Sequence, residues 1–423
     1  MNNVVPEGWE YNPLSSLADI DKGSLKASTD PNYRFRYVDI ASVSTGRIDL
    51  PSERISFSES PSRARKKVQS GDVLMSTVRP NLKSFAYFEA KGDDYIASTG
   101  FSVIRAVNGN DGRFLFNSIL ADDITRQIEA KVVGSNYPAI NSSDVKNLEV
   151  LTPTRPEQKK IAKILTSVDE VIEKTQAQID KLKGLKTGMM QELLTRGVGV
   201  DGKPHTEFKD SSVGRIPKGW DCLSLKSITK RITDGTHQAV KTSKEGHIPF
   251  LYVSCIKDGV IDWNKASMLT EEMYEAASKG RKPEVGDILY TAVGSYGNAA
   301  LVTKNTQFSF QRHIAFIQLD IEKVHPEFIS CFLNSLMGKK QADFFAIGNA
   351  QLSVTLGDLG KFKVPLPQKN EQVKIALAMK SVEDSLRTTY RKLQSVGNVK
   401  KALMQDLLTG KVRVTPDEED FEC

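Results

Sequence analysis

The stretch Pro153-Thr-Arg-Pro-Glu-Gln-Lys-Lys-Ile161 is matched 214 residues later by Pro367-Gln-Lys-Asn-Glu-Gln-Val-Lys-Ile375. The same offset carries Leu193-Leu194-Thr195 to Leu407-Leu408-Thr409. Agreement at one constant offset over this length indicates a tandem duplication rather than a chance match. We therefore treat the chain as two related halves.

Each half begins with a first part that matches its counterpart only weakly. Pro6-Glu7-Gly8-Trp9 corresponds to Pro217-Lys218-Gly219-Trp220. Strand-forming residues bounded by turn residues fill 72–78 and 287–293, and the patterns at 114–130 and 326–345 predict helices. Strands and helices mixed in this way predict an α+β (mixed α/β) fold for both first parts.

The second part of each half predicts a long helix. Apolar residues recur there at alternating steps of four and three over more than four heptads, which is typical of a coiled coil. Thr175 with Thr389, and Lys186 with Lys400, interrupt the two seams at matching places. These polar positions either fix the register of the helices or lie where the helices separate and meet water. The residues predicted to form the helix interface are Ile161, Leu165, Val168, Ile172, Ile179, Leu182, Ile375, Met379, Val382, Leu386, Leu393 and Val396.

The order of these parts is globular, helical, globular, helical. An antiparallel pairing of the two helices within the chain relates the globular parts by a pseudo-two-fold axis. B-DNA has a local two-fold axis of the same kind, so two-fold proteins read two half-sites on one duplex. Similar helices with divergent globular parts then predict two different half-sites.

Composition limits the classes of protein to which the chain can belong. No apolar run approaches the roughly 18–20 residues of a membrane span, and the N-terminus lacks the features of a secretory signal. The four cysteines are scattered, so neither a disulfide framework nor a zinc site is indicated, and we expect a cytoplasmic protein. The net charge is +6 even though residues 417–423 hold five acids and no base. A body this basic fits a polyanionic partner, although lysine-rich surfaces also occur in proteins that never contact DNA.

Motifs that would make the chain an enzyme are missing. Neither a Gly-x-x-x-x-Gly-Lys-Ser/Thr loop nor a Gly-x-Ser-x-Gly elbow occurs. Asp30-Pro31-Asn32-Tyr33 has Asn where the adenine methyltransferase motif has a second proline, and a turn accounts for it better. The alternatives are a protein that reads DNA, a basic coiled-coil interaction scaffold without sequence-specific DNA binding, and a stand-alone nuclease or methyltransferase with cryptic motifs. The missing cofactor motifs argue against the enzyme.

Four groups of residues together resemble one known family, the specificity subunits of type I restriction–modification systems. They are the two Pro-x-x-x-Glu-Gln-x-x-Ile stretches, the two Leu-Leu-Thr endings, the segment 207–220, and the Gly-Asp-Val/Ile-Leu motifs at 71–74 and 286–289. The similarity covers essentially the whole chain in the family's order, twice. Only the acidic tail departs from the pattern.

The resemblance implies a non-catalytic subunit whose target recognition domains each read one half of a bipartite, asymmetric DNA site. It implies that the helices set the spacer and dock two modification subunits, which methylate adenine using S-adenosylmethionine. Two restriction subunits, which use ATP and magnesium, complete the complex, and this chain itself is expected to bind no cofactor or metal. The expected domains are recognition domain one (1–152), helical region one (153–196), a linker (197–215), recognition domain two (216–364), helical region two (365–411) and an acidic tail (412–423).

Candidate DNA contacts lie in loops and basic clusters of both recognition domains. Arginine and lysine can bond guanine, asparagine can bond adenine, and exposed cations can bind phosphates. A solvated surface charge or a turn is the competing explanation for each residue. The candidates in domain one are Arg34, Arg36, Arg65, Lys66, Arg79, Asn81 and Lys83. Those in domain two are Asp234, Thr236, His237, Lys241, Tyr296, Asn298, Arg312 and His313.

Overall fold

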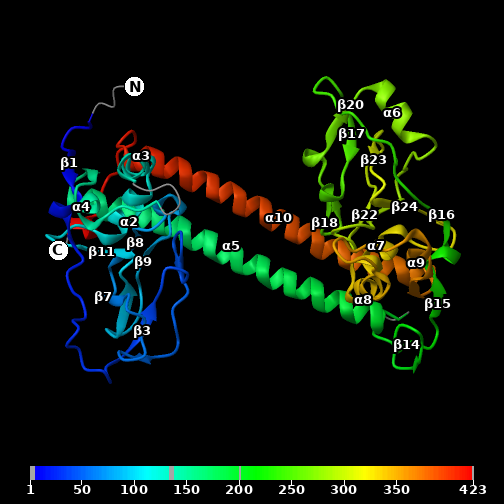
Figure 1. Cartoon of the computed structure of the whole chain (residues 1–423), viewed down its shortest axis with the longest axis horizontal. Helices are drawn as coiled ribbons and strands as arrows, with labels where there is room; N and C mark the ends of the chain where they lie inside the picture. Colours follow the sequence, from blue (N-terminus) through cyan, green and yellow to red (C-terminus); the bar gives the residue numbers. More distant parts are fainter. Residues whose placement is uncertain (1–4, 133–137, 200–201, 422–423) are drawn as a thin grey trace. The chain divides into compact units, whose positions relative to one another are not determined.

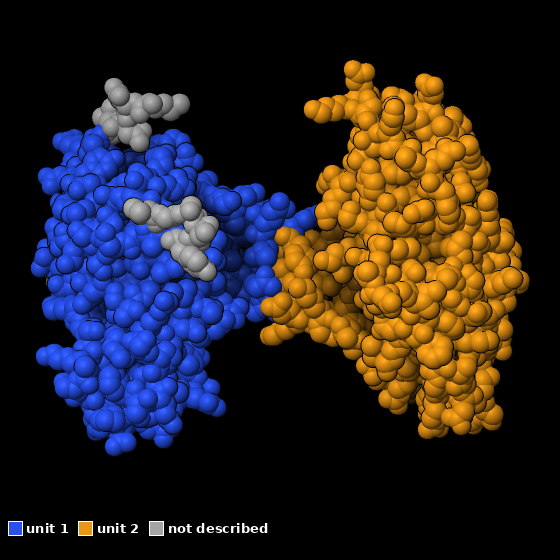
Figure 2. All heavy atoms as spheres, in the orientation of Figure 1, with its two compact units in different colours: residues 1–177, 391–423 blue, residues 178–390 orange. Residues whose placement is uncertain are grey.

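The computed structural model describes residues 5–132, 138–199 and 202–421. Its contacts divide the chain into two units, shown in blue and orange in Figure 2. Unit 1 contains Met1–Ala177 and Arg391–Cys423, and unit 2 contains Gln178–Tyr390. Cys423, one of the scattered cysteines, lies outside the described residues. Both units mix helices and strands (Figure 1), as the sequence predicts.

Unit 1 is built around two four-stranded sheets. The first has the order β2-β11-β8-β9 and is antiparallel throughout. The second has the order β6-β3-β10-β7, in which β10 pairs parallel with β3. The elements are β1 (Glu10–Pro13), α1 (Leu14–Leu17), β2 (Ala18–Ile20), β3 (Arg34–Val38), β4 (Val43–Ser44), β5 (Arg47–Ile48), β6 (Ile55–Ser56), β7 (Ala64–Val68), β8 (Val73–Ser76), β9 (Phe85–Tyr87), β10 (Tyr95–Ser98), β11 (Phe101–Ala106), α2 (Gly112–Leu120), α3 (Asp122–Lys131), α4 (Ser142–Lys146) and β12 (Glu149–Thr152).

Unit 2 repeats this topology. Its antiparallel sheet has the order β16-β24-β21-β22, and its second sheet, β20-β17-β23, keeps one parallel pairing. The elements are β13 (Phe208–Lys209), β14 (Ile216–Pro217), β15 (Asp221–Ser224), β16 (Thr229–Asp234), β17 (Ile248–Leu251), β18 (Ile256–Lys257), β19 (Val260–Ile261), β20 (Ser267–Leu269), α6 (Glu271–Ser278), β21 (Ile288–Thr291), β22 (Ala299–Leu301), β23 (Ser309–Phe310), β24 (Ile314–Leu319), α7 (Pro326–Asn334), α8 (Leu336–Phe345), α9 (Leu356–Lys361) and β25 (Lys363–Leu366).

The two units differ in the element that precedes the Gly-Asp motif. In unit 1 the segment before the Gly-Asp motif forms β7, which pairs antiparallel with β10. In unit 2 the segment at the same place in the order forms the helix α6, which Thr270 caps by accepting a hydrogen bond from the Met273 N–H. The two units therefore share the order of their sheets but differ in the element before the Gly-Asp motif, which is a strand in unit 1 and a helix in unit 2.

The central strands are where the sequence places them. β8 and β21 lie within the predicted strands 72–78 and 287–293, and all four residues of each strand are buried. The predicted helices 114–130 and 326–345 are each broken into two. Ser335 breaks the second because its backbone is extended and its side chain accepts a hydrogen bond from Gly338, starting α8 as a new helix.

The two long helices are α5 (Arg155–Thr195) and α10 (Lys369–Leu408). In unit 1 the beginning of α5 and the end of α10 share one hydrophobic core, which contains Ile161, Leu165 and Leu407. In unit 2 the end of α5 and the beginning of α10 share another, which contains Leu194 and Ile375. The two helices are thus antiparallel within each unit.

All predicted interface positions on α5 and α10 are at least partly buried. Thr175 and Thr389 are 2% and 7% exposed, and each hydroxyl donates to the carbonyl four residues earlier. These threonine layers therefore do not meet water. Buried positions are Ile161, Leu165, Ile179, Ile375, Met379, Val382 and Leu386, and half-buried ones are Val168, Ile172, Leu182, Leu393 and Val396.

Candidate nucleic-acid interface

The three candidate residues in the loop after β8 of unit 1 have different surroundings. Arg79 precedes a short 3-10 turn (Pro80–Leu82) and Asn81 lies within it, and both side chains are exposed. Lys83 instead donates from Nζ to the Leu120 carbonyl, at 3.1 Å, where α2 ends. The last carbonyls of a helix lack partners within the helix, so Lys83 has a structural role there.

Arg36 of unit 1 is held by Asp94. Its Nη1 lies 2.8 Å from Asp94 Oδ1, and its guanidinium lies over the Tyr95 ring at 5.2 Å. Arg54 pairs with the same carboxylate at 2.6 Å. Arg34 is exposed and donates to the Arg54 carbonyl at 3.0 Å. Of the two β3 candidates, Arg34 is therefore the one available to a phosphate.

Lys66 and Arg65, neighbours on β7, also differ. The Lys66 side chain is only 14% exposed, and its Nζ lies 2.8 Å from Asp21 Oδ1. The Arg65 guanidinium lies over the Phe57 ring at 4.8 Å and is half-buried. A buried charge needs a partner, and Asp21 supplies it, so Lys66 holds the fold together.

In unit 2 two segments far apart in the sequence meet at one edge of the sheet that contains β16 and β24. Asp234 ends β16 and residues 235–237 follow it, whereas residues 311–313 precede β24. The Thr236 N–H donates to the Phe310 carbonyl at 3.0 Å, and the Arg312 N–H donates to the Thr236 carbonyl at 3.1 Å. The candidates that the structure brings together at this edge are Asp234, Thr236, His237, Arg312 and His313.

The approach of these two segments depends on Gly235. A Cβ at this position would lie 2.2 Å from the Phe310 carbonyl oxygen and 2.4 Å from the Gln311 carbonyl oxygen. Both obstacles are backbone atoms, which cannot rotate away. His237 completes the turn with its Nε2 2.6 Å from Asp234 Oδ2, and its side chain is 59% exposed.

The loop after β21 joins the same edge, because the Ala292 N–H donates to the His313 carbonyl at 2.9 Å. In this loop the Tyr296 hydroxyl donates to Asp343 Oδ1 at 2.9 Å, which ties the loop to α8. Asn298 Nδ2 donates to the Ser295 carbonyl at 2.9 Å and closes the loop on itself. Lys241 is exposed further along the chain from β16. The equivalent loop of unit 1 carries Arg79 and Asn81, so equivalent loops carry different chemistry.

A buried carboxylate directly precedes β8 in unit 1 and β21 in unit 2, and it has a different partner in each unit. In unit 1, Asp72 is 1% exposed and accepts two hydrogen bonds of 2.7 Å from Arg105. In unit 2, Asp287 is 6% exposed and accepts from the Glu284 N–H at 2.8 Å. Burial raises the pKa of Asp287 to about 6, because the charged form is poorly solvated there.

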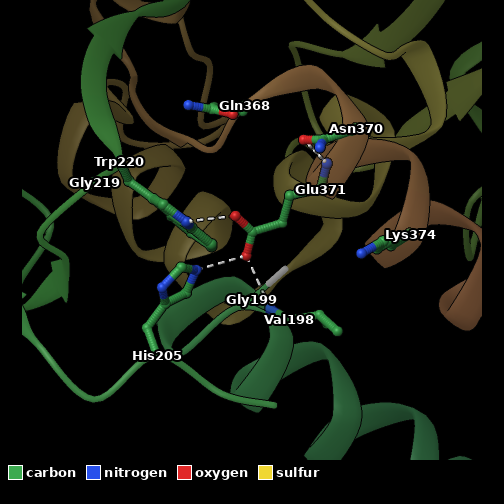
Figure 3. A pocket seen from close by; sticks show the side chains of 9 residues that line it. All are labelled: Val198, Gly199, His205, Gly219, Trp220, Gln368, Asn370, Glu371 and Lys374. Carbon is green, nitrogen blue, oxygen red and sulfur yellow. Dashed lines mark hydrogen bonds and ion pairs between the residues drawn. The ribbon is translucent and has the colours of Figure 1, made fainter. Parts of the chain in front are cut away.

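A pocket of about 140 Å³ lies at the start of α10 in unit 2 (Figure 3). Its centre is the Glu371 carboxylate, which accepts from the Val198 N–H at 2.9 Å and from Trp220 Nε1 at 3.1 Å, with His205 Nε2 3.0 Å away. Gly197 has a φ of +66°, and a Cβ there would lie 2.6 Å from the Trp220 ring and 2.4 Å from Glu371 Oε1, so this position favours glycine. These contacts anchor the chain after α5 onto α10.

Unit 1 has a matching anchor at Glu157, 214 residues before Glu371. Arg413 donates to Glu157 Oε1 from Nε and Nη2 at 2.9 and 2.7 Å. Burial opposes ionisation of Glu157, but hydrogen bonds from Arg413 and Thr154 outweigh it and hold the pKa below its ordinary value. The pocket in unit 2 is therefore one of two structural anchors rather than a ligand site.

The described residues contain no group of three or more His, Cys, Asp and Glu side chains that could hold a metal ion. Within the same ranges, no helix is both long and apolar enough to cross a membrane.

The sequence did not predict one segment at the unit 2 edge, residues 347–353, although Gly134 and Gly348 match at the common offset. Gly134 lies outside the described residues.

Comparisons with known proteins agree on one family. The family described as "Type I restriction modification DNA specificity domain" matches residues 6–183 and 217–397. A putative type I restriction enzyme MjaX specificity subunit from Methanocaldococcus jannaschii is 26% identical, over 97% of this chain and 95% of that protein. The EcoBI specificity subunit from Escherichia coli is 24% identical, over 67% of this chain and 63% of that protein.

Solved structures support the fold. The type I restriction–modification S subunit from M. genitalium aligns with a TM-score of 0.60 and 17% identity, over 96% of this chain and 97% of that one. A chain from a study of complex assembly in the type I system aligns with a TM-score of 0.60 and 22% identity, over 97% of this chain and 100% of that one. Because the family matches most of the chain in two successive copies, this chain belongs to the type I restriction–modification DNA specificity family, whose members recognise DNA and are not catalytic.

Proposed function

We propose that units 1 and 2 each read one half of a bipartite, asymmetric DNA site for a type I restriction–modification complex. The observation that carries the proposal is that one topology occurs twice, with chemically different loops at the equivalent edge of the sheet. Arg79 and Asn81 occupy that place in unit 1, whereas in unit 2 the Tyr296 loop bonds to His313, beside the segment that carries His237. Different loops on one scaffold fit two different half-sites.

We assign recognition domains to residues 1–152 and 216–364, helical regions to 153–196 and 365–411, a linker to 197–215 and an acidic tail to 412–423. The helices α5 and α10 form an antiparallel coiled-coil pair with internal pseudo-two-fold symmetry. Two ion pairs at equivalent repeat positions, Lys186–Glu383 and Lys400–Asp169, support this assignment. The pair sets the spacer between half-sites and docks the modification subunits.

The proposed complex contains two modification subunits and two restriction subunits and acts on DNA in the cytoplasm. S-adenosylmethionine, ATP and magnesium belong to these partners, and this chain binds none of them. The chain thereby directs both adenine methylation and restriction. A scaffold without sequence preference is not favoured, because the family match spans both recognition domains.

Adenine methylation mapping tests the proposal. Cells carrying this gene with its neighbouring modification gene are compared with cells lacking this gene alone. We expect a bipartite motif with a fixed spacer that disappears on deletion. A methylation pattern that is unchanged by deletion, or a single contiguous motif, contradicts the proposal.

A further inference from the structure

Residues 347–353 form a closed hairpin in unit 2 directly after α8. The Ile347 N–H donates to the Ser353 carbonyl at 2.9 Å, and the Ser353 N–H donates back at 2.8 Å. Gly348 has a φ of +120°, and a Cβ there would lie 2.5 Å from the Gln351 carbonyl oxygen. The narrow turn therefore requires glycine.

The hairpin is continuous with the candidate interface of unit 2. The Gly294 N–H donates to the Leu352 carbonyl at 2.9 Å, and the Val354 N–H donates to the Ala292 carbonyl at 2.8 Å. Ala292 in turn donates to His313, so the hairpin, the Tyr296 loop and residues 311–313 are joined by backbone hydrogen bonds. Any DNA bound to those loops comes close to the hairpin.

The hairpin and the end of α8 expose large apolar side chains to solvent. Ile347 is 57% exposed and Leu352 is 40% exposed, and Phe344 just before them is 81% exposed. Asn349 and Gln351, between the two aliphatic residues, are also exposed. Exposed apolar residues with polar residues beside them are typical of interaction sites when they form a contiguous patch.

We infer that this hairpin reads an A·T base pair in the major groove, an inference that rests on the proposed function. The hairpin is a loop closed by one antiparallel bridge between Ile347 and Ser353, and the major groove admits elements as wide as a two-stranded β-ribbon. Asparagine and glutamine amides pair with adenine N6 and N7, and apolar side chains contact the thymine methyl group. Asn349 or Gln351 bonds the adenine, and Ile347 or Leu352 covers the methyl group.

The experiment uses the full chain assembled with its modification subunit and duplexes carrying the mapped motif. Each thymine in the motif is replaced by uracil, which removes only the methyl group. We expect one replacement in a single half-site to weaken binding several-fold for the unaltered protein and to have no further effect on Ile347→Ala or Leu352→Ala.

The amide arm compares Asn349→Ala and Gln351→Ala with Gln307→Ala. Gln307 is an exposed amide in the same unit. It follows β22 in the chain, whereas the Tyr296 loop precedes that strand. We expect at least one hairpin variant to lose roughly 5- to 150-fold in affinity, the range for a good bidentate base contact, and to accept other base pairs at one position. Gln307→Ala should bind like the unaltered protein.

The outcomes separate this inference from the proposed function. If the unaltered assembly discriminates no sequence, the proposed function fails. If it discriminates and all four hairpin variants retain its full sequence preference, only the hairpin inference is overturned. Variants that bind DNA normally but no longer assemble with the modification subunit assign the hairpin to a protein contact and also overturn it. Unchanged hydrogen exchange in β21 and β24 checks that the variants are folded.

Discussion

Lys186 on α5 and Glu383 on α10 form an ion pair in unit 2, with Nζ 2.8 Å from Oε1. The repeat offset of 214 maps Lys186 onto Lys400 and Asp169 onto Glu383. Lys400 and Asp169 form the equivalent pair in unit 1, at 2.6 Å. One polar contact is therefore used twice between the same two helices, once in each unit.

Reversing the charge at Lys186 should weaken the pairing of the helices in unit 2. We expect Lys186→Glu to reduce stability by about 0.5–1 kcal/mol, because the pair is partly exposed and salt screens it. Adding Glu383→Lys in the same chain should recover most of the loss. Urea unfolding at low and high salt measures both effects, and a double variant no better than the single one contradicts the ion-pair role.

Asp287 should make unit 2 less stable as the pH rises from about 4 to 6. Its pKa is about 6 in the folded protein, against an ordinary value of 3.8, so the folded state holds the proton more tightly than the unfolded chain does. The difference of about two corresponds to a penalty of up to about 3 kcal/mol, complete above pH 6. Asp287→Asn should therefore stabilise unit 2 at pH 7.5 and change little at pH 4.

The control is Asp72→Asn in unit 1, which should have the opposite sign. Arg105 loses its charged partner there, and we expect a loss of about 1–3 kcal/mol. Hydrogen exchange resolved by peptide distinguishes the two units in one measurement. Equal effects of the two substitutions would falsify the assignment of Arg105 as the difference between them.

Arg413→Ala should destabilise unit 1 by about 1–3 kcal/mol at neutral pH, because it leaves the buried Glu157 carboxylate without its strongest donor. The pKa of Glu157 is lowered from 4.5, so the stability it contributes is present above that pH and is lost as the pH falls through the folded pKa. The difference between variant and unaltered protein should therefore shrink as the pH falls below the ordinary value of 4.5. Arg413→Lys, which cannot form two parallel hydrogen bonds to a carboxylate, should recover only part of the stability lost in Arg413→Ala. Hydrogen exchange at the start of α5 measures the effect, and a difference independent of pH contradicts the explanation.

Gly235→Ala should damage recognition by unit 2, whereas Gly23→Ala, near the start of unit 1, should be tolerated. A Cβ on Gly235 meets backbone oxygen at 2.2 Å, but a Cβ on Gly23 meets only the Lys67 side chain at 3.5 Å. We expect Gly235→Ala to weaken site binding by about tenfold or more, comparable to losing one base contact. Binding to the mapped motif and to duplexes altered in one half-site measures this. A loss confined to the unit 1 half-site contradicts the placement of the loop.

Much of the fold could be predicted from the sequence because it depends on local periodicity and on the repeat. The heptads predict α5 and α10, and strand-forming residues bounded by turn residues at 72–78 and 287–293 predict β8 and β21. The fate of individual cations could not be predicted. Lys66 is internal because Asp21, which is distant in the sequence, lies beside it, and Lys83 is held by the end of α2. Such pairings are set by tertiary contacts and leave no trace in local spacing.

Unit 2 is a continuous stretch of chain, whereas unit 1 is completed by residues 391–423. Synthesis on the ribosome proceeds from the N-terminus, so all of unit 2 emerges before the last part of unit 1. Until then Trp9 and the first turns of α5 lack Leu407, Leu408 and Arg413, which cover them in the finished protein. The first half to be translated is therefore the last to be completed, and a chain that stops in α10 leaves its N-terminal unit open.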